Sequence, residues 1–306
     1  MDSSIVSAFA SKHLQKHGKT LRTFSIGMPG GVDEKYAKMV AKHIGSNHTH
    51  VEVSEQEFLD VIPDVIKTLG SFDITTVRAS TGQYLLSKWI SENTDIKVLA
   101  CGDFSDEEMG SYLYFLNAKT PKDFHDECIR MLEDIHMYDG MRADRCISHF
   151  GIEARFPFAD HRLIDFILRC DPQLRMAKDG VEKWLLRKSL EAQPTLWDGI
   201  DLLPPEVLWR QKCAFSDAVS STERSWYEII QENAEKMYTD DDLKEAQEKF
   251  THLPPYTKES LYFRNIFCNT FGHNESVAKT IPYIWLPKWS GNITEPSARI
   301  LDICKG

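Results

Sequence analysis

The sequence predicts an α/β fold in which a parallel sheet occupies the first part of the chain and helices make up most of the rest. Three observations lead to this prediction. Strand-like apolar runs alternate with helix-like segments over residues 1–117, those segments are long enough for right-handed crossovers, and residues 118–306 show helix after helix without a convincing strand. No glycine- or serine-rich linker divides the chain, so we expect one domain, with an α/β part (1–117) and a mainly helical part (118–306).

Apolar periodicity sets the expected elements of the first 117 residues. The expected strands are 21–27, 48–53 and 96–100. The expected helices are 3–17, 33–45, 54–70 and 77–93. Asp33 is the expected N-cap of the second helix and Gly45 its end, while Ser54 and Glu57 stand in capping-box spacing. Strands joined by helices of this length are typical of a parallel sheet that helices cover on both faces.

The composition argues against nucleic-acid and membrane partners. The 36 basic and 46 acidic side chains give a net charge of −10 without a basic patch, so we do not expect a nucleic-acid partner. No window approaches the roughly 18 to 20 apolar residues of a membrane-spanning helix, so we expect no membrane partner. The seven cysteines are widely spaced and form no CxxC pair, and the first residues do not read as a signal peptide. Together these features indicate reduced thiols and a cytoplasmic location.

Four short polar stretches remain as candidates for chemistry, because HExxH, GxSxG, Walker A and GxGxxG motifs do not occur. They are MDSS (1–4), FSIG (24–27), CGDFSDE (101–107) and WRQKCAFSD (209–217). The third follows the expected strand 96–100, and ligands bind at the C-terminal ends of strands in open α/β sheets. An ordinary strand-to-helix turn is the other interpretation of this acidic loop.

Each stretch has a structural and a functional interpretation. Asp2 and Ser3 begin a helix, where they either cap it or lie where a phosphate docks. Ser105 either caps a helix with Asp106 in its first turn, or Asp106 helps to hold Mg²⁺ on a nucleotide, because hard cations bind carboxylate oxygens. Lys212 is either a solvated lysine or a cation that offsets charge developing on a triphosphate.

In combination and order, longer motifs resemble one family. They are SFDITTVRAS (71–80), CGDFSDE, MRADRCISHFGIEARFPFADHR (141–162), LWRQKCAFSD (208–217), TKESLYFRNIF (257–267) and YIWLPKW (283–289). From Met1 to about Lys288 the chain is similar to the synthetase domain of the asparagine synthetases, and most similar to the eukaryotic type.

This resemblance implies an adenine-nucleotide α-hydrolase-like (PP-loop) core, with a parallel sheet and a pyrophosphate-binding loop of the form SGGxDS. It also implies ATP-dependent amidation of aspartate to asparagine through β-aspartyl-AMP, with release of AMP and pyrophosphate. ATP and Mg²⁺ are the implied cofactors. The implied substrates are aspartate and ammonia, the latter free or derived from glutamine.

The resemblance also assigns roles to single positions. Asp103 matches a glutamate linked to the adenylate and to deprotonation of ammonia, and Lys212 matches a lysine near the phosphates, so both are predicted catalytic residues. Asp106 matches the carboxylate on the Mg²⁺ side. The predicted ATP-binding residues are Asp2, Ser3, Ile26, Cys101 and Gly102.

The sequence departs from the family pattern in three places. It shows no amino-terminal glutaminase domain, so we expect ammonia to come from solution or from a glutaminase or synthetase partner chain. It begins at a position matching the x of SGGxDS, so we expect either a truncation or a strand supplied by another polypeptide. The family's Gly–Glu–Gly is replaced by Gly102–Asp103–Phe104, in which the carboxylate is one methylene shorter. Phe104 is strained if its position requires a positive φ.

These departures leave a second function open. The chain is then a catalytically impaired relative that acts as a binding or regulatory partner. A different acid is a third alternative, but the TTVRAS motif at 75–80 and the EARFPFADHR motif at 153–162 favour aspartate.

Overall fold

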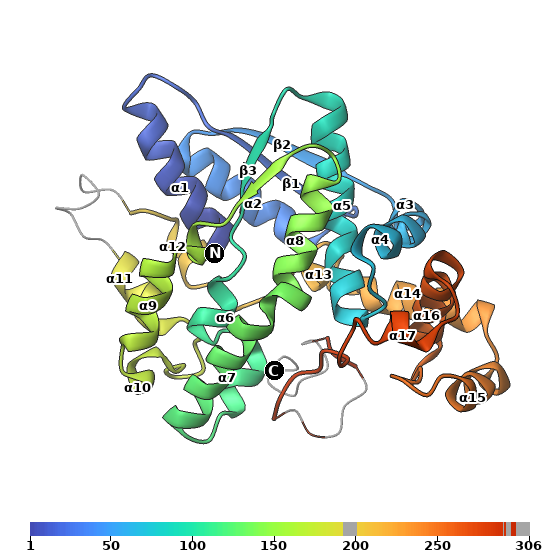
Figure 1. Ribbon diagram of the computed structural model, residues 1–306. Coiled ribbons are helices and arrows are strands. Elements are labelled where there is room, and N and C mark those ends of the chain that lie inside the picture. The colour runs from blue at the N-terminus through green and yellow to red at the C-terminus, as the bar shows by residue number, and fades with distance from the viewer. Residues whose placement is uncertain (192–200, 290, 292–294, 298–306) are drawn as a thin grey trace.

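The structure is a computed structural model that describes residues 1–191, 201–289, 291 and 295–297. Its strands gather at one end of the molecule, between the first helices and the helices α5 (Ile74–Asn93) and α8 (Asp139–Ser148) (Figure 1). The helices of the first part are α1 (Asp2–Gln15), α2 (Val32–Ile44), α3 (Glu55–Asp60), α4 (Ile62–Leu69) and α5 (Ile74–Asn93).

Two pairs of parallel strands form the sheet structure. The strand β1 (Arg22–Gly27) pairs with β2 (Asn47–Glu52), and β3 (Val98–Ala100) pairs with β4 (Glu153–Arg155). The three expected strands and their parallel direction are confirmed. Within the described residues, however, the two pairs are not hydrogen-bonded to each other, so they do not make one continuous sheet.

The expectation that no strand lies beyond residue 118 is wrong, because β4 lies there. Only three residues long, it carries charged side chains at both ends, so no apolar alternation marks it. It becomes a strand because β3 lies beside it, with Leu99 opposite Ala154. The ladder continues past β3, where the Cys101 N–H donates to the Arg155 carbonyl at 2.8 Å.

Local capping chemistry explains most helix boundaries. The Ser54–Glu57 capping box is confirmed, and so is the end of α2 at Gly45, which has the left-handed φ of 64° that glycine tolerates. Asp33 is not the N-cap of α2, because Gly31 holds that position and Asp33 lies in the first turn. The expected helix 54–70 is two helices, since Pro63 has no N–H to continue the hydrogen-bond ladder.

The remainder of the chain is mainly helical, as predicted. Its α-helices are α6 (Ser105–Met109), α7 (Pro121–Asp134), α8 (Asp139–Ser148), α9 (His161–Arg169), α10 (Pro172–Arg175), α11 (Trp184–Leu190), α12 (Pro205–Leu208), α13 (Phe215–Ala218), α14 (Trp226–Met237), α15 (Asp240–Lys249), α16 (Lys258–Phe271) and α17 (Glu275–Ala278). Short 3₁₀ helices cover η1 (Leu113–Asn117), η2 (Ile135–Met137) and η3 (Pro157–Ala159). The division of one domain near residue 117 stays a prediction.

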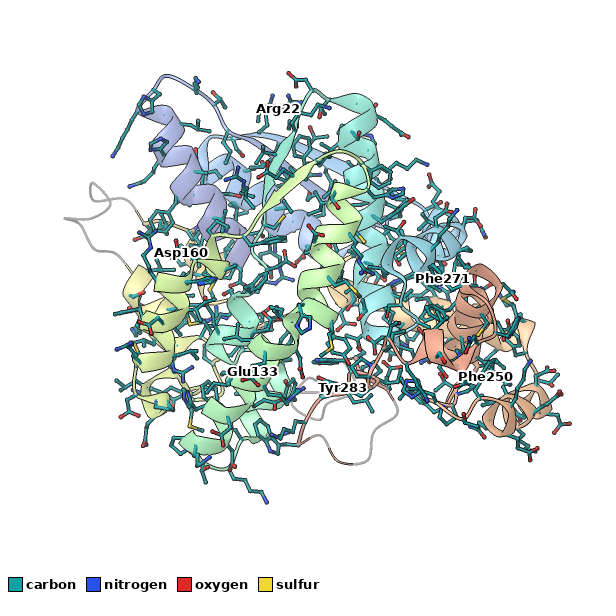
Figure 2. All side chains as sticks on the ribbon, viewed as in Figure 1. Arg22, Glu133, Asp160, Phe250, Phe271 and Tyr283 are labelled. Atoms are coloured by element: carbon teal, nitrogen blue, oxygen red, sulfur yellow. The ribbon has the colours of Figure 1, made fainter. Side chains whose placement is uncertain are left out.

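Two groups of helices lie on opposite sides of the molecule (Figure 2). Asp160 precedes α9 in one group, while Phe250 and Phe271 belong to the other, formed by α14–α17. The second group docks through aromatic side chains, for the fully buried Trp226 packs against Phe58 with ring centroids 5.1 Å apart. The contact between these two buried rings stabilises the packing of α14 against α3. Among the described helices, none is long and apolar enough to cross a membrane.

Candidate functional site

The loop after β3 packs directly against the first turn of α1. Gly102 is the point of contact, since a Cβ at this position would lie 2.3 Å from the Ser3 backbone nitrogen and 2.9 Å from the Asp2 Cβ. Only glycine permits this approach. Three residues further on, the Ser105 hydroxyl donates to the Asp2 carboxylate at 3.0 Å. Four of the predicted site residues are thereby drawn together: Asp2, Ser3, Cys101 and Gly102.

A buried lysine from far along the chain joins this loop to α1. The Lys183 ammonium lies 2.6 Å from the Asp2 carboxylate and 2.7 Å from the Asp106 carboxylate, with only 2% of its side chain exposed. Its backbone has a positive φ of 53°, which is uncommon for a lysine. A strained backbone and a buried charge at one residue are features that cluster at functional sites.

Lys212 contributes the second cation. It forms an ion pair with Asp106 and leaves 17% of its side chain exposed. Burial raises the pKa of Asp106, but Lys183 and Lys212 outweigh burial and hold the pKa well below its ordinary value. Burial likewise lowers the pKa of Lys212, yet Asp106 and Asp2 hold it above its ordinary value. The site therefore contains the carboxylates of Asp2 and Asp106 and the side chains of Lys183 and Lys212, joined by ion pairs.

Asp103 points into a different network. Its carboxylate accepts a hydrogen bond from Arg142 at 3.0 Å, and Arg142 also donates to Asp139 at 2.8 Å and to Gln83 at 3.0 Å. Burial raises the pKa of Asp103, against the opposing effect of Arg142. Such a carboxylate takes up a proton more readily than one in water.

Phe104 has the strained backbone that its position was expected to impose. Its φ is 78°, and it occupies the N-cap position of α6 that was expected for Ser105. The strain is offset by packing, because the ring of Phe104 lies 5.4 Å from that of Phe156. Ser105 is instead the first residue of α6, followed by three acidic residues in its first turn, as predicted.

Two of these acids are buried and have raised pKa values. Burial, then the neighbouring Asp139 and Asp106, raises the pKa of Glu107 to about 8, and its carboxylate accepts a hydrogen bond from Tyr112 at 2.6 Å. Burial also raises the pKa of Glu108 to about 8. Neither carboxylate oxygen of Glu108 has a hydrogen-bond partner among the described residues.

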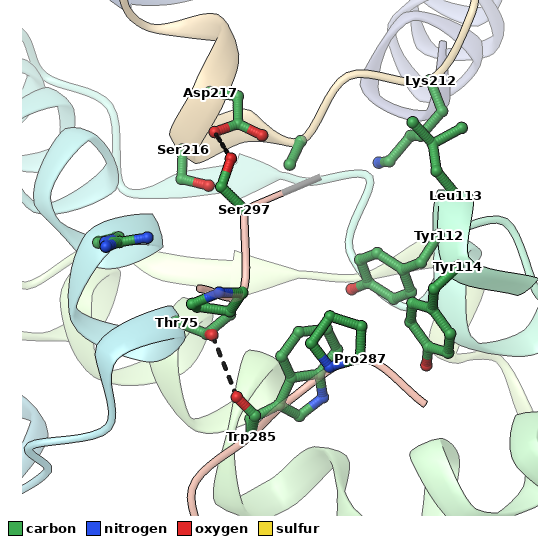
Figure 3. A pocket seen from close by; sticks show the side chains of 13 residues that line it. Thr75, Tyr112, Leu113, Tyr114, Lys212, Ser216, Asp217, Trp285, Pro287 and Ser297 are labelled. Carbon is green, nitrogen blue, oxygen red and sulfur yellow. Dashed lines mark hydrogen bonds between the residues drawn. The ribbon is translucent and has the colours of Figure 1, made fainter. Parts of the chain in front are cut away.

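A cavity of about 70 Å³ lies beside Lys212. Figure 3 shows Lys212 and Tyr112 on one side of it, with Asp217 and Thr75 on the other. Trp285 closes it from below, and its carbonyl accepts a hydrogen bond from Thr75 at 3.4 Å.

Arg78, from the TTVRAS motif, brings a further buried charge to the cavity wall. Only 4% of its side chain is exposed, and it forms ion pairs with Glu259 and Glu295. The Trp226 indole N–H donates to the Arg78 carbonyl at 3.3 Å, which fixes this turn of α5 against α14. Arginine binds carboxylates with two parallel hydrogen bonds, and at Arg78 these bonds are made to Glu259 and Glu295 of the chain itself.

The other predicted residues lie apart from these charges. Ile26 is 3% exposed and packs in the core of the β1–β2 pair, and no described contact joins it to the two lysines. Burial raises the pKa of the Cys101 thiol to about 12, which makes this thiol a poor nucleophile. No described group of three or more histidine, cysteine and acidic side chains could hold a metal ion by itself.

Lys183 and Arg78 are the site residues that sequence reasoning missed. Lys183 is the N-cap residue of α11 and Lys188 lies within that helix, and no local pattern distinguishes the buried lysine from the exposed one. Arg78 stood inside a quoted motif but was not singled out. A buried charge with two acidic partners is visible only once the chain is folded.

Comparisons with known proteins agree on one family. The model of the asparagine synthase family matches residues 1–123 and 116–281. The chain is 41% identical to the asparagine synthetases [glutamine-hydrolyzing] of Bos taurus and Homo sapiens over 303 residues, 98% of its length. It is 42% identical over 307 residues to a probable asparagine synthetase [glutamine-hydrolyzing] of Acanthamoeba polyphaga mimivirus. The chain spans about half the length of these relatives, 52% to 53% of each.

Proposed function

The chain belongs to the asparagine synthase family, and from this premise we propose that it catalyses the ATP-dependent amidation of aspartate to asparagine through β-aspartyl-AMP. One observation carries the proposal. The buried Lys183 pairs with Asp2 and Asp106, and the partly buried Lys212 pairs with Asp106, at the turn where Gly102 meets α1 and beside a cavity that Arg78 lines. This arrangement supplies cations for a triphosphate and for an acidic substrate within one region.

The two lysines are the proposed ligands of the ATP phosphates. Each now neutralises a carboxylate, and a phosphate oxygen can take the place of that carboxylate because both are anionic acceptors. Positioned ammonium groups offset the charge that develops on the phosphates as pyrophosphate leaves. Gly102 lets the loop backbone lie against the first turn of α1. Cys101 and Gly102 keep their proposed role of contacting the nucleotide. Ile26, predicted to bind ATP, is the proposed contact of adenine through its backbone.

The donor set fits Mg²⁺. Asp2 and Asp106 both reach the Lys183 ammonium, so their carboxylates lie close together, and Mg²⁺ is usually held by one or two carboxylates with substrate phosphates. When bound, Mg²⁺ would neutralise phosphate charge and polarise the phosphorus centre. Asp106 remains the proposed metal ligand, with Asp2 beside it.

Arg78 is the proposed anchor of the aspartate α-carboxylate. A bidentate arginine holds a carboxylate in a fixed orientation, which leaves the β-carboxylate to face the nucleotide. An oxygen of that β-carboxylate attacks the α-phosphorus of ATP, the bond to the bridging oxygen breaks, and pyrophosphate leaves with the electron pair.

Ammonia completes the reaction. Its nitrogen attacks the β-carbonyl carbon of β-aspartyl-AMP, AMP leaves, and one proton passes from the nitrogen to a base. Asp103 is the proposed base, since its burial favours proton uptake. The relatives are named as glutamine-hydrolysing. For this chain we propose ammonia as the nitrogen donor, either free or delivered by a glutaminase.

Exchange of labelled pyrophosphate into ATP tests the first step. We expect exchange that depends on aspartate and falls by about 100-fold in Lys212→Ala, because one cation on the developing charge is lost. Lys188→Ala is the matched control, since Lys188 is 46% exposed and pairs with Glu191 on the surface. Exchange no greater than that of Lys212→Ala would refute the proposal and favour a binding or regulatory role. AMP release with other carboxylic acids but not with aspartate would reassign the substrate.

A further inference from the structure

Residues 295–297 lie at the wall of the cavity. Glu295 accepts hydrogen bonds through both carboxylate oxygens from the guanidinium of Arg78, one of them at 3.0 Å. The Gln231 amide donates to the same carboxylate at 2.6 Å, and so does the Ser297 N–H at 2.8 Å. Pro296 and Ser297 line the cavity.

The two carboxylates that bind Arg78 differ in secondary structure and in exposure. Glu259 lies in the capped first turn of α16 and is 1% exposed. Glu295 lies outside any helix or strand and is 15% exposed. Loss of Glu295 would leave Arg78 paired with Glu259 and with half of its guanidinium available to another carboxylate.

The segment also offers a hydrogen-bond donor. The Ser297 hydroxyl donates to the Asp217 carboxylate at 2.9 Å (Figure 3). The segment therefore places an acceptor on a buried arginine and a donor on a buried aspartate. A free α-amino acid carries the same pair of groups, because its carboxylate accepts hydrogen bonds and its ammonium donates them.

We propose that residues 295–297 are an intramolecular mimic of the acidic substrate, which must be displaced before aspartate binds to Arg78 and Asp217. The inference rests on the proposed function and adds a form of regulation to the same site. Aspartate can bind only to molecules in which the segment has left the cavity. The apparent affinity for aspartate is therefore the intrinsic affinity multiplied by the fraction of such molecules. Displacement exposes residues 295–297 to solvent.

Binding of L-aspartate to the full chain tests the inference by titration calorimetry. We expect Glu295→Ala to bind aspartate about tenfold more tightly than the native chain, and Glu295→Gln, which keeps the size of the side chain, to show a smaller gain. Glu275→Ala is the matched control, because Glu275 pairs with another buried arginine, Arg264, away from the cavity. The control should leave the affinity unchanged.

Hydrogen exchange of the native chain gives a second readout that does not require turnover. Saturating aspartate should accelerate exchange of the Ser297 amide, since displacement removes its hydrogen bond to Glu295. Equal aspartate affinity in the native chain and both Glu295 variants, with unchanged exchange at Ser297, would overturn the mimicry while leaving the proposed function intact. No aspartate binding by any of these chains would overturn both.

Discussion

Glu108 is expected to make the protein less stable as the pH rises. Its carboxyl group is fully buried and has no hydrogen-bond partner in the described part of the chain, and burial raises its pKa from 4.5 to about 8. The folded state therefore keeps a proton that the unfolded state releases above pH 4.5. The contribution of this carboxyl to the free energy of unfolding is greatest below pH 4.5 and is lost progressively as the pH approaches 8.

The size of the effect follows from the pKa. Between pH 5 and pH 8 the ionisation of Glu108 in the unfolded state lowers the free energy of unfolding by about 1.4 kcal/mol for each pH unit. Over the three units the free energy of unfolding falls by about 4 kcal/mol. Glu108→Gln places a neutral group of the same size in the same space. The stability of this variant relative to the native chain should therefore rise by about 4 kcal/mol over that interval.

Urea unfolding at pH 5, 6, 7 and 8 measures this difference at constant ionic strength. Comparison of the two chains at each pH removes the contributions of the other raised acids, Glu107 and Asp73, because both chains contain them. Glu248→Gln is the control, since Glu248 is exposed on α15. If the free energy of unfolding depends on pH in the same way for the native chain and for Glu108→Gln, the reasoning is refuted.

Four further outcomes are expected. Gly102→Ala should lower the free energy of unfolding by about 1 to 3 kcal/mol, measured by urea unfolding, because its Cβ would lie 2.3 Å from the Ser3 nitrogen. Lys183→Met should cost about 3 to 5 kcal/mol in the same assay, since it leaves buried carboxylates short of a cation. Asp103→Asn should retain pyrophosphate exchange but reduce asparagine formation, followed by amino-acid analysis, by about 100-fold. Chelation of Mg²⁺ should weaken ATP binding in titration calorimetry, and Asp106→Asn should make that binding insensitive to the chelator.

Local signals predicted the elements that local chemistry builds. The capping box at Ser54 and the turn at Gly45 were correct because each depends on a few adjacent residues. The strand β4 was not predicted because its three residues have no apolar alternation. They form a strand because they pair with the neighbouring β3. The break in helix 54–70 was readable from Pro63, but the apolar pattern on both sides of it concealed the boundary.

In the candidate site, too, the features set by adjacent residues were predicted and the contacts between distant residues were not. The close approach at Gly102 and the positive φ of Phe104 follow from the turn itself, and the family resemblance pointed to both positions. Lys183 meets Asp2 across 181 residues of sequence, and Arg78 meets Glu259 across the same separation. No periodicity in the sequence encodes these pairs, since they arise where separate helices pack.

Charge balance links the site to the ligands proposed for it. Asp2 and Asp106 neutralise Lys183 and Lys212, so the buried group has no net charge. If a triphosphate took both lysines, the two carboxylates would stay buried without a cation, and breaking a buried pair costs about 3 to 5 kcal/mol. A divalent ion arriving with the nucleotide restores the balance, because carboxylate and phosphate oxygens are its preferred donors. The same ion pairs that join the loop to α1 therefore favour a metal-complexed nucleotide over a bare one.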